Sequence, residues 1–258
     1  MSLCLEMLYR DRPFVERMGE ARRLGYEAIE FWDWRDKDLA AVAAEARRLG
    51  LEIVAMSGNR AHSLVNPADR AGLLEEMDQV FAIARRLRCT RVMLLSDVLQ
   101  GESCRPLPAG VSAEAQAESM VEGLRLLAQR VEGQELALLL EPLNTVLDHR
   151  GCFLHGTATA VAALERVNHT QVRLLYDVYH MTMMGEDAPA AIAAAGRWLG
   201  HVHAADVPGR HEPGSGSIDW LAVRQALAQQ SYEGFIGLEF APGASDGAAA
   251  RRARETFA

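Results

Sequence analysis

The chain has 258 residues, 49% of them hydrophobic and 24% charged, which is the composition of an ordinary globular protein with a large core. Its formal net charge of −8 argues against binding to a nucleic-acid backbone, so no nucleic-acid partner is expected. No apolar run approaches the roughly 18 residues of a membrane span, and the first residues do not form a signal peptide. We therefore expect a cytoplasmic protein with no membrane partner, and free thiols at its four scattered cysteines, Cys4, Cys89, Cys104 and Cys152.

Short apolar runs alternate with longer amphipathic ones from one end of the chain to the other. The apolar runs predict strands at 3–8, 28–31, 52–56, 91–95, 136–141, 172–177, 199–205 and 235–239. The amphipathic runs predict helices at 13–24, 38–49, 68–87, 113–131, 157–167, 188–195, 218–230 and 245–255. Gly25 and Gly50 follow two of these helices, where a left-handed residue commonly ends a helix.

Eight strands in alternation with eight helices predict a parallel sheet that closes into a (β/α)8 barrel, also called a TIM barrel. We expect residues 1–258 to form this barrel as a single domain, because no linker or low-complexity segment interrupts them. The segment after the first strand, Leu8-Tyr9-Arg10-Asp11, lacks the glycine-rich sequence of a dinucleotide site. The irregular segment 96–111 is predicted to be a loop over the barrel mouth.

The last four predicted strands carry ionisable residues at or near their ends, namely Glu141, Asp177, His203 and Glu239. In a (β/α) barrel the C-terminal ends of the strands meet at the active site, so these side chains are expected to converge. Three carboxylates in one small space repel each other unless a positive charge lies among them. The set therefore predicts a divalent metal site, with Mn²⁺ or Mg²⁺ preferred and Co²⁺, Zn²⁺ or Fe²⁺ as alternatives. The alternative interpretation is that each residue forms a salt bridge or caps a helix.

Residues near the predicted mouth on the first two strands are weaker candidates. Glu6 and Glu30 end these strands and either line the mouth or pair with nearby arginines. Trp32, Trp34 and Tyr9 form either an apolar wall against the carbon face of a sugar or ordinary packing.

Five sequence segments together resemble the hydroxypyruvate isomerase family within the xylose isomerase-like superfamily of sugar isomerases and epimerases. They are Glu141-Pro142-Leu143-Asn144-Thr145, Tyr176-Asp177-Val178-Tyr179-His180-Met181, Gly200-His201-Val202-His203-Ala204-Ala205-Asp206, Pro208-Gly209-Arg210-His211-Glu212-Pro213-Gly214 and Gly237-Leu238-Glu239-Phe240-Ala241-Pro242. The resemblance extends more loosely over the N-terminal half, through Glu30-Phe31-Trp32-Asp33-Trp34 and Ser57-Gly58-Asn59. It implies that Glu141, Asp177, His203 and Glu239 bind the metal and that Glu141 and Glu239 also transfer the proton.

The resemblance also implies substrate contacts at His180, Arg210 and Glu212, and His62 is a further candidate because it follows the Ser57-Gly58-Asn59 segment. The alternative for Arg210 is a loop salt bridge with Asp206 or Glu212.

The activity that the resemblance implies is isomerisation of a small hydroxy-keto acid to its aldehyde form, of the hydroxypyruvate/tartronate semialdehyde type, through an enediol. The alternative on the same scaffold is a ketose 3-epimerase or a 2-oxo-tetronate or keto-sugar isomerase, and two departures from the family pattern favour the 3-epimerase. Relatives often carry glutamine at position 203, and no basic residue follows Glu239 before Arg251. A barrel endonuclease and a non-catalytic sugar-acid-binding barrel are further alternatives. The expected partner is a keto acid or sugar, and a homo-oligomer is compatible with the sequence.

Overall fold

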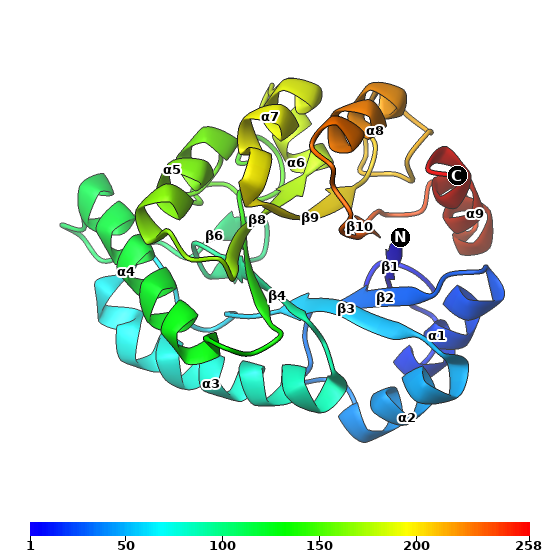
Figure 1. Cartoon of the computed structure of the whole chain (residues 1–258), viewed down its shortest axis with the longest axis horizontal. Coiled ribbons are helices and arrows are strands. Elements are labelled where there is room, and N and C mark those ends of the chain that lie inside the picture. The colour runs from blue at the N-terminus through cyan, green and yellow to red at the C-terminus, as the bar shows by residue number, and fades with distance from the viewer.

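A computed structural model describes all residues, 1–258, and its centre is a closed barrel of eight parallel strands (Figure 1). These strands are β1 (Ser2–Cys4), β2 (Ala28–Phe31), β3 (Glu52–Ser57), β4 (Arg91–Leu95), β7 (Ala137–Glu141), β8 (Val172–Asp177), β9 (Leu199–Ala204) and β10 (Ile236–Leu238). Each strand pairs with its neighbours in chain order, and β1 pairs with β10 to close the barrel. The prediction of a (β/α)8 barrel is therefore confirmed.

Helices form an outer ring around the strands, as Figure 1 shows. They are α1 (Phe14–Arg23), α2 (Leu39–Leu49), α3 (Arg70–Leu87), α4 (Ala113–Val131), α5 (Thr157–Val167), α6 (Val178–Met183), α7 (Ala188–Ala195), α8 (Trp220–Gln229) and α9 (Asp246–Thr256), with short 3₁₀ turns at Pro67–Asp69 and Gly196–Trp198. None of these helices is long and apolar enough to cross a membrane.

Helix α2 illustrates how local sequence sets the bounds of these elements. The Asp38 side chain accepts hydrogen bonds from the backbone N–H groups of Ala40 and Ala41, and so caps the start of the helix. Gly50 ends it with a φ of 63°, a left-handed conformation that costs glycine little. Leu39, Val42 and Ala46 share the buried face of α2, so the helix is held by packing as well as by its caps.

The barrel closes through a short seam between the first and last strands. Ser2 pairs with Gly237, and Leu3 pairs with Leu238. By contrast, β4 and β7 share five register pairs. The seam is therefore a narrow connection between neighbouring barrel strands, and it joins segments from opposite ends of the chain.

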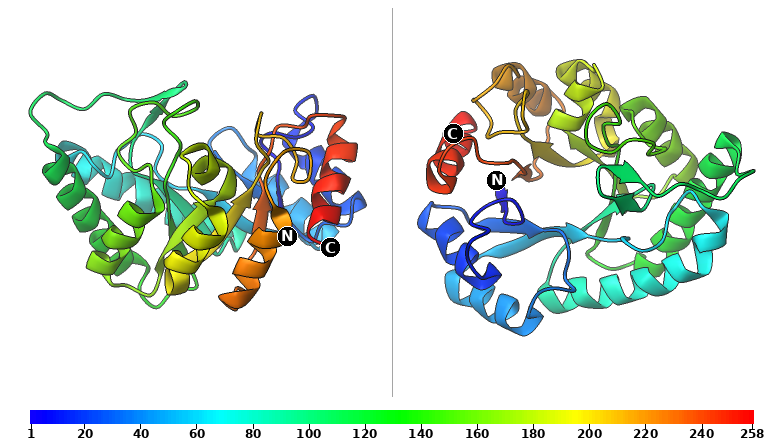
Figure 2. Two further views of the ribbon diagram at one scale, coloured as in Figure 1. Left: turned by 90° about the horizontal axis from the view of Figure 1, so that it is seen from above. Right: turned by 180° about the vertical axis from the view of Figure 1, so that it is seen from behind.

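Three features differ from the predicted alternation. The first strand ends at Cys4 instead of position 8, because the chain turns away from the sheet while Leu5 and Leu8 remain in the core. Helix α6 is not among the predicted helices; it begins directly at the end of β8, where Asp177 caps it. The segment predicted as a loop over the mouth contains a two-stranded hairpin of β5 (Leu99–Gln100) and β6 (Ser103–Cys104). Figure 2 shows the stretch between this hairpin and α4 extending beyond the ring of helices.

The expectation of four free thiols is wrong for two of the cysteines. Cys104, at the end of β6, forms a disulfide with Cys152, 48 residues further along the chain. The pairing arises because the loop after β7 folds back against the hairpin, where the Cys104 backbone N–H donates to the Arg150 carbonyl at 2.9 Å. Cys4 and Cys89 are free and buried.

Candidate functional site

A pocket of about 320 Å³ lies at the C-terminal ends of the barrel strands. Its lining combines acids, bases and apolar side chains: Trp32, Ser57, Arg60, Met93, Leu95, Leu99, Gly101, Glu141, Leu143, His149, His180, Arg210 and Glu239. Leu99 and Gly101 belong to the hairpin segment, so the loop predicted to lie over the mouth does contribute to the pocket.

The four predicted metal-binding residues converge at this end of the barrel, and two of them, Glu141 and Glu239, line the pocket. Glu141 and Asp177 are the last residues of β7 and β8, His203 lies near the end of β9, and Glu239 directly follows β10. Each offers a ligand atom, and these four atoms all lie within 4.8 Å of one another. All four residues are at least 93% buried. One ion could therefore contact the whole group.

Glu30 on β2 fixes the orientation of the imidazole in this group. Its Oε2 lies 2.9 Å from Nε2 of His203, and its Oε1 lies 3.0 Å from Nε2 of His201 and also accepts a hydrogen bond from the Ser2 hydroxyl. Because an ionised carboxylate can only accept, Nε2 of His203 carries the hydrogen. Nδ1 of His203 then faces Glu141 and Glu239, at 3.7 and 3.5 Å.

The environment of Nδ1 of His203 shows whether these residues fit a metal ion. This atom is buried and has no hydrogen-bond partner, although unpaired buried nitrogen atoms are costly. Burial alone lowers the pKa of His203, but Glu239, Glu141 and Glu30 raise it well above its ordinary value. The surroundings of Nδ1 thus favour a positive charge, and the oxygen-rich set with one imidazole suits a divalent cation.

The Glu239 carboxylate is held on both oxygens. Its Oε1 accepts the Trp32 indole N–H at 2.5 Å, and its Oε2 forms an ion pair with Arg210. Burial raises the pKa of Glu239, but the charges of His203 and Arg210 outweigh burial and lower it to about 2. Trp32 therefore does more than offer an apolar wall, because it also orients a candidate catalytic carboxylate.

Glu141 differs from Glu239, because its carboxylate accepts no hydrogen bond within the protein and Nδ1 of His203 lies 3.7 Å away. Burial, assisted by the charges of Glu239 and Asp177, raises the pKa of Glu141 to about 7. Asp177 is held more firmly, since its Oδ1 accepts the backbone N–H groups of Tyr179 and His180 at 2.8 and 3.2 Å. The two glutamates thus occupy contrasting environments within one pocket.

His180 lines the pocket from the first turns of α6. Its Nδ1 lies 2.7 Å from the side-chain amide nitrogen of Asn144, so Nδ1 accepts and the hydrogen is on Nε2. The Asn144 orientation is set because its Oδ1 accepts the N–H groups of Leu147 and Asp148. Burial and the nearby positive charge of Arg210 lower the pKa of His180 well below its ordinary value, which leaves a neutral imidazole as a hydrogen-bond donor.

Arg210 points into the pocket and not toward its own loop. It pairs with Glu239 and approaches Asp177 Oδ2 at 3.4 Å, whereas the alternative partners expected from the sequence, Asp206 and Glu212, form no ion pair with it. Its backbone φ is 55°, which few residues other than glycine adopt. The loop is held in this shape because the Ala241 N–H donates to the Arg210 carbonyl at 2.8 Å.

Two of the predicted substrate contacts are not among the residues that line the pocket. Glu212 is buried and accepts the Gly243 N–H at 2.9 Å, which braces the loop around Arg210. His62 is partly exposed, and its Nδ1 lies 3.1 Å from Glu76. The structure therefore brings His180 and Arg210 to the four predicted ligands and leaves Glu212 and His62 outside the pocket.

Sequence reasoning does not single out three residues that the structure places in or around the pocket. Arg60 and His149 lie in loops after strands and have no distinctive spacing. Asn144 lies in one of the five family-like segments, but nothing in the sequence indicates that it orients His180. The sequence also does not predict that Glu30 orients His203, because nothing in it indicates hydrogen bonds between Glu30 and two histidines more than 170 positions away.

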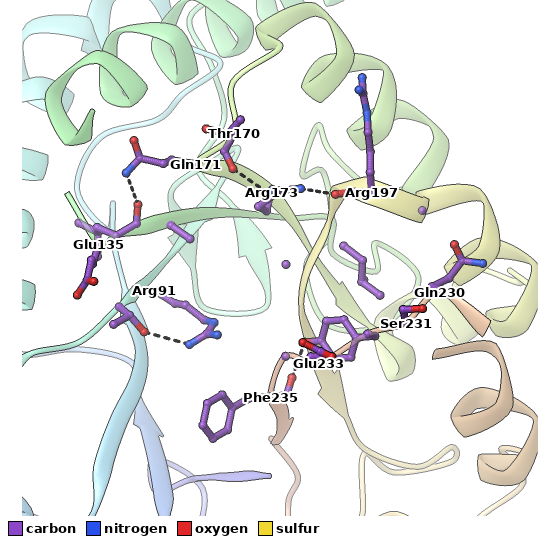
Figure 3. Close-up of a pocket in the computed structure, with 18 of the residues that line it drawn as sticks. Arg91, Glu135, Thr170, Gln171, Arg173, Arg197, Gln230, Ser231, Glu233 and Phe235 are labelled. Carbon is purple, nitrogen blue, oxygen red and sulfur yellow. Dashed lines mark hydrogen bonds between the residues drawn. The ribbon is translucent and has the colours of Figure 1, made fainter. Parts of the chain in front are cut away.

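A larger cavity, of about 760 Å³, opens at the opposite end of the barrel and is drawn in Figure 3. Arg91, Arg173 and Phe235 lie there at or near the beginnings of their strands. Arg173 donates to the carbonyls of Thr170, at 2.7 Å, and Arg197, while Arg91 stacks over the Phe235 ring. These two arginines are thus held by the chain itself, as expected for the end of a barrel that contributes to stability.

Comparison with known proteins places these features in context. A family model described as "Xylose isomerase-like TIM barrel" matches residues 18–257. A putative hydroxypyruvate isomerase of Streptomyces coelicolor is 30% identical, over 93% of this chain and 89% of its own length. The hydroxypyruvate isomerase of Escherichia coli K12 is 28% identical, over 93% of both chains.

Solved structures show the same fold at lower sequence identity. A Brucella melitensis protein described as an AP endonuclease of family 2 superposes with a TM-score of 0.88, at 24% identity over 96% of this chain and 95% of its own. The D-psicose 3-epimerase of Clostridium cellulolyticum superposes with a TM-score of 0.78, at 19% identity over 96% of this chain and 88% of its own.

Proposed function

The chain belongs to the xylose isomerase-like TIM barrel family and is an isomerase of the sugar isomerase/epimerase type, and from this premise we propose that it interconverts a small hydroxy-keto acid and its aldehyde isomer. The substrate pair is of the hydroxypyruvate/tartronate semialdehyde type. The observation that carries the proposal is the pair of buried carboxylates, Glu141 and Glu239, whose oxygens lie 3.7 and 3.5 Å from the same unpaired nitrogen of His203.

We assign Glu141, Asp177, His203 and Glu239 as the ligands of a divalent cation, Mn²⁺ or Mg²⁺ in preference to Co²⁺ or Zn²⁺. The buried, unpaired Nδ1 of His203 and the three surrounding carboxylates support this assignment. When bound, such a cation stabilises the negative charge that develops on the substrate oxygens during proton transfer.

The reaction moves two protons and no heavy atom. A carboxylate removes the proton from the hydroxymethyl carbon, the hydroxyl proton passes to the former carbonyl oxygen, and a proton is returned at the former carbonyl carbon. Glu141 has an oxygen free of strong donors and is suited to accept a proton from carbon. Glu239, oriented by Trp32 and Arg210, is the second carboxylate of the pair.

His180 and Arg210 orient the substrate oxygens in this proposal. The His180 imidazole carries its hydrogen on Nε2, because Asn144 donates to the other ring nitrogen. Trp32, Leu95 and Leu143 contribute apolar surface that limits the water around the reacting carbons. Glu212 and His62 are assigned no direct contact, because neither lines the pocket.

A ketose 3-epimerase, or a 2-oxo-tetronate or keto-sugar isomerase, is the second candidate. His203 favours the 3-epimerase, since relatives of the hydroxypyruvate isomerase type often carry glutamine there, and the same two carboxylates would allow inversion at one carbon. Isomerisation can use one carboxylate, whereas epimerisation needs one on each side of the substrate. The pair is therefore compatible with both candidates, and the choice between them depends on the substrate.

Deuterium incorporation tests the proposed chemistry. With Mn²⁺ present, hydroxypyruvate turned over in D₂O should give a product that carries deuterium at the carbon that received the proton. Glu141→Gln should lower kcat by about 10²–10⁴-fold, since it keeps a ligand oxygen but removes the base. Chelator treatment should abolish activity and added Mn²⁺ should restore it. An unlabelled product, together with a fully active Gln variant that retains its metal, would refute the mechanism.

We also propose that residues 1–258 act as one domain. The main hydrophobic core supports this, because its 63 buried residues extend from Leu3 to Ala253 without a break between units. Limited proteolysis should therefore yield no stable fragment that comprises half of the barrel.

A further inference from the structure

Two arginines, Arg210 and Arg60, line the pocket, and only the first forms ion pairs. The Arg210 charge is neutralised by Glu239 and Asp177, which lie within ion-pair distance. Arg60, in the loop after β3, also lines the pocket but forms no ion pair, and its side chain donates no hydrogen bond within the protein. The nearby acid Asp33 is itself bonded to Arg35 at 3.0 Å. The guanidinium of Arg60 is thus available to a ligand.

The backbone that carries Arg60 is nevertheless rigidly held. The buried Glu76 carboxylate accepts the N–H groups of Arg60, Ala61 and His62, at 2.9, 3.0 and 3.1 Å. The Asn59 side chain ties the same loop to the end of β4, where it exchanges two hydrogen bonds with the Leu95 backbone, at 2.9 and 3.1 Å. An arginine anchored in this way loses little backbone freedom when it binds a ligand, which favours recognition.

The charges around the pocket indicate what kind of ligand fits. In the proposed function the carboxylates of Glu141, Asp177 and Glu239 are balanced by one divalent cation and by Arg210. Arg60 lines the same pocket and forms no ion pair, so it adds one positive charge to its side of the pocket. A substrate with a single carboxylate balances it, whereas a neutral sugar does not. A planar guanidinium also matches a carboxylate geometrically, since it can donate two parallel hydrogen bonds.

We propose that Arg60 binds the carboxylate of the substrate and makes the enzyme prefer a keto acid to a neutral ketose of the same size. This inference rests on the proposed function, because it names the group that selects among substrates of that site. It also supplies the basic residue that the segment after Glu239 lacks.

A matched pair of substrates tests the proposal. Hydroxypyruvate and dihydroxyacetone differ in that a carboxylate in the first is replaced by a neutral hydroxymethyl group in the second. Arg60→Gln should raise the KM for hydroxypyruvate about ten-fold, because a charge-assisted contact is lost, and should leave kcat/KM for dihydroxyacetone within about two-fold. The KM of Arg60→Lys for hydroxypyruvate should lie between those of the wild type and Arg60→Gln, since lysine keeps the charge but not the paired donors.

The control is Arg166→Gln, which removes one positive charge from a surface arginine on α5 that pairs with Glu118. It should leave both substrates unaffected. If Arg60→Gln lowers kcat/KM equally for the two substrates, Arg60 supports the structure of the loop. If the KM values are unchanged, Arg60 does not contact the substrate. Either result overturns the proposal.

Failure of the proposed function can be recognised separately. If the wild-type enzyme does not turn over hydroxypyruvate, the proposed function is wrong, and D-glycerate then tests Arg60 without catalysis. Calorimetry with the Mn²⁺-loaded protein should show D-glycerate binding about ten-fold more weakly to Arg60→Gln than to the wild type. Equal binding to both would overturn the role of Arg60, whatever reaction the enzyme catalyses.

Discussion

The Glu30→Gln substitution tests whether Glu30 orients the proposed metal site or only stabilises the fold of the barrel. Glu30 is fully buried and accepts hydrogen bonds from Ser2, His201 and His203. Gln keeps one acceptor oxygen, but its amide group is a donor and would face an imidazole N–H. One histidine therefore loses its partner, and Nδ1 of His203 is no longer held toward Glu141 and Glu239.

Two magnitudes follow from this geometry. Loss of a partner that orients a metal-binding histidine typically weakens metal affinity by about 10–100-fold. A buried donor left without an acceptor costs about 1–3 kcal/mol of stability. We therefore expect weaker Mn²⁺ binding, measured by the electron paramagnetic resonance signal of free Mn²⁺, and a lower midpoint of thermal unfolding in the presence of chelator.

The matched control is Glu52→Gln, which changes an exposed glutamate at the start of β3, far from the four predicted ligands. It should alter neither quantity. If Glu30→Gln lowers the unfolding midpoint while Mn²⁺ binds as tightly as before, then Glu30 only supports the fold and the orientation argument is refuted.

Two further predictions concern packing and the cysteines. Gly237→Ala should destabilise the protein by about 1–3 kcal/mol and weaken metal binding, because the new Cβ would lie 2.5 Å from Glu30 Oε1 and 2.7 Å from His203 Cδ2. Gly19→Ala in α1 meets nothing within 4 Å and should stabilise by about 0.5–1 kcal/mol; equal melting curves for the two variants would contradict this reasoning. Burial raises the pKa of Cys89 to about 12, so the folded protein keeps this thiol protonated above pH 9 while the unfolded chain ionises, and stability should fall as the pH rises through that range. An alkylating reagent at about pH 8 should therefore label neither Cys4 nor Cys89 in the native protein but both after unfolding, and rapid native labelling would show that these sites open readily.

The sequence predicts those parts of the structure that depend on neighbouring residues and on strand order. The bounds of β2, β4, β8, α4, α5 and α7 agree with the predicted ranges. Convergence of Glu141, Asp177, His203 and Glu239 follows once the barrel topology is assumed, since the carboxyl ends of parallel strands meet at one face.

Features that depend on contacts between distant loops could not be predicted. The Cys104–Cys152 disulfide requires that the loop after β7 folds against the hairpin, and neither spacing nor composition indicates this. Helix α6 is only six residues long and begins directly after the last residue of a strand. Its hydrophobic pattern is therefore too short to distinguish a helix from a loop. Arg60 becomes a candidate only when the structure shows which arginines in the pocket lack a partner.

The short β1–β10 seam has a consequence for how the enzyme gains and loses its activity. Glu30 and Trp32 come from the N-terminal end of the chain, whereas His203 and Glu239 come from its C-terminal end, and their hydrogen bonds span 173 and 207 positions. Contacts of such large sequence separation form late in folding, because a long loop must be closed before they stabilise anything. The oriented site can thus exist only after the two ends of the chain have met. Conversely, a local opening confined to the two register pairs of the seam would disorganise the site while most of the barrel stays folded, so inactivation should precede global unfolding.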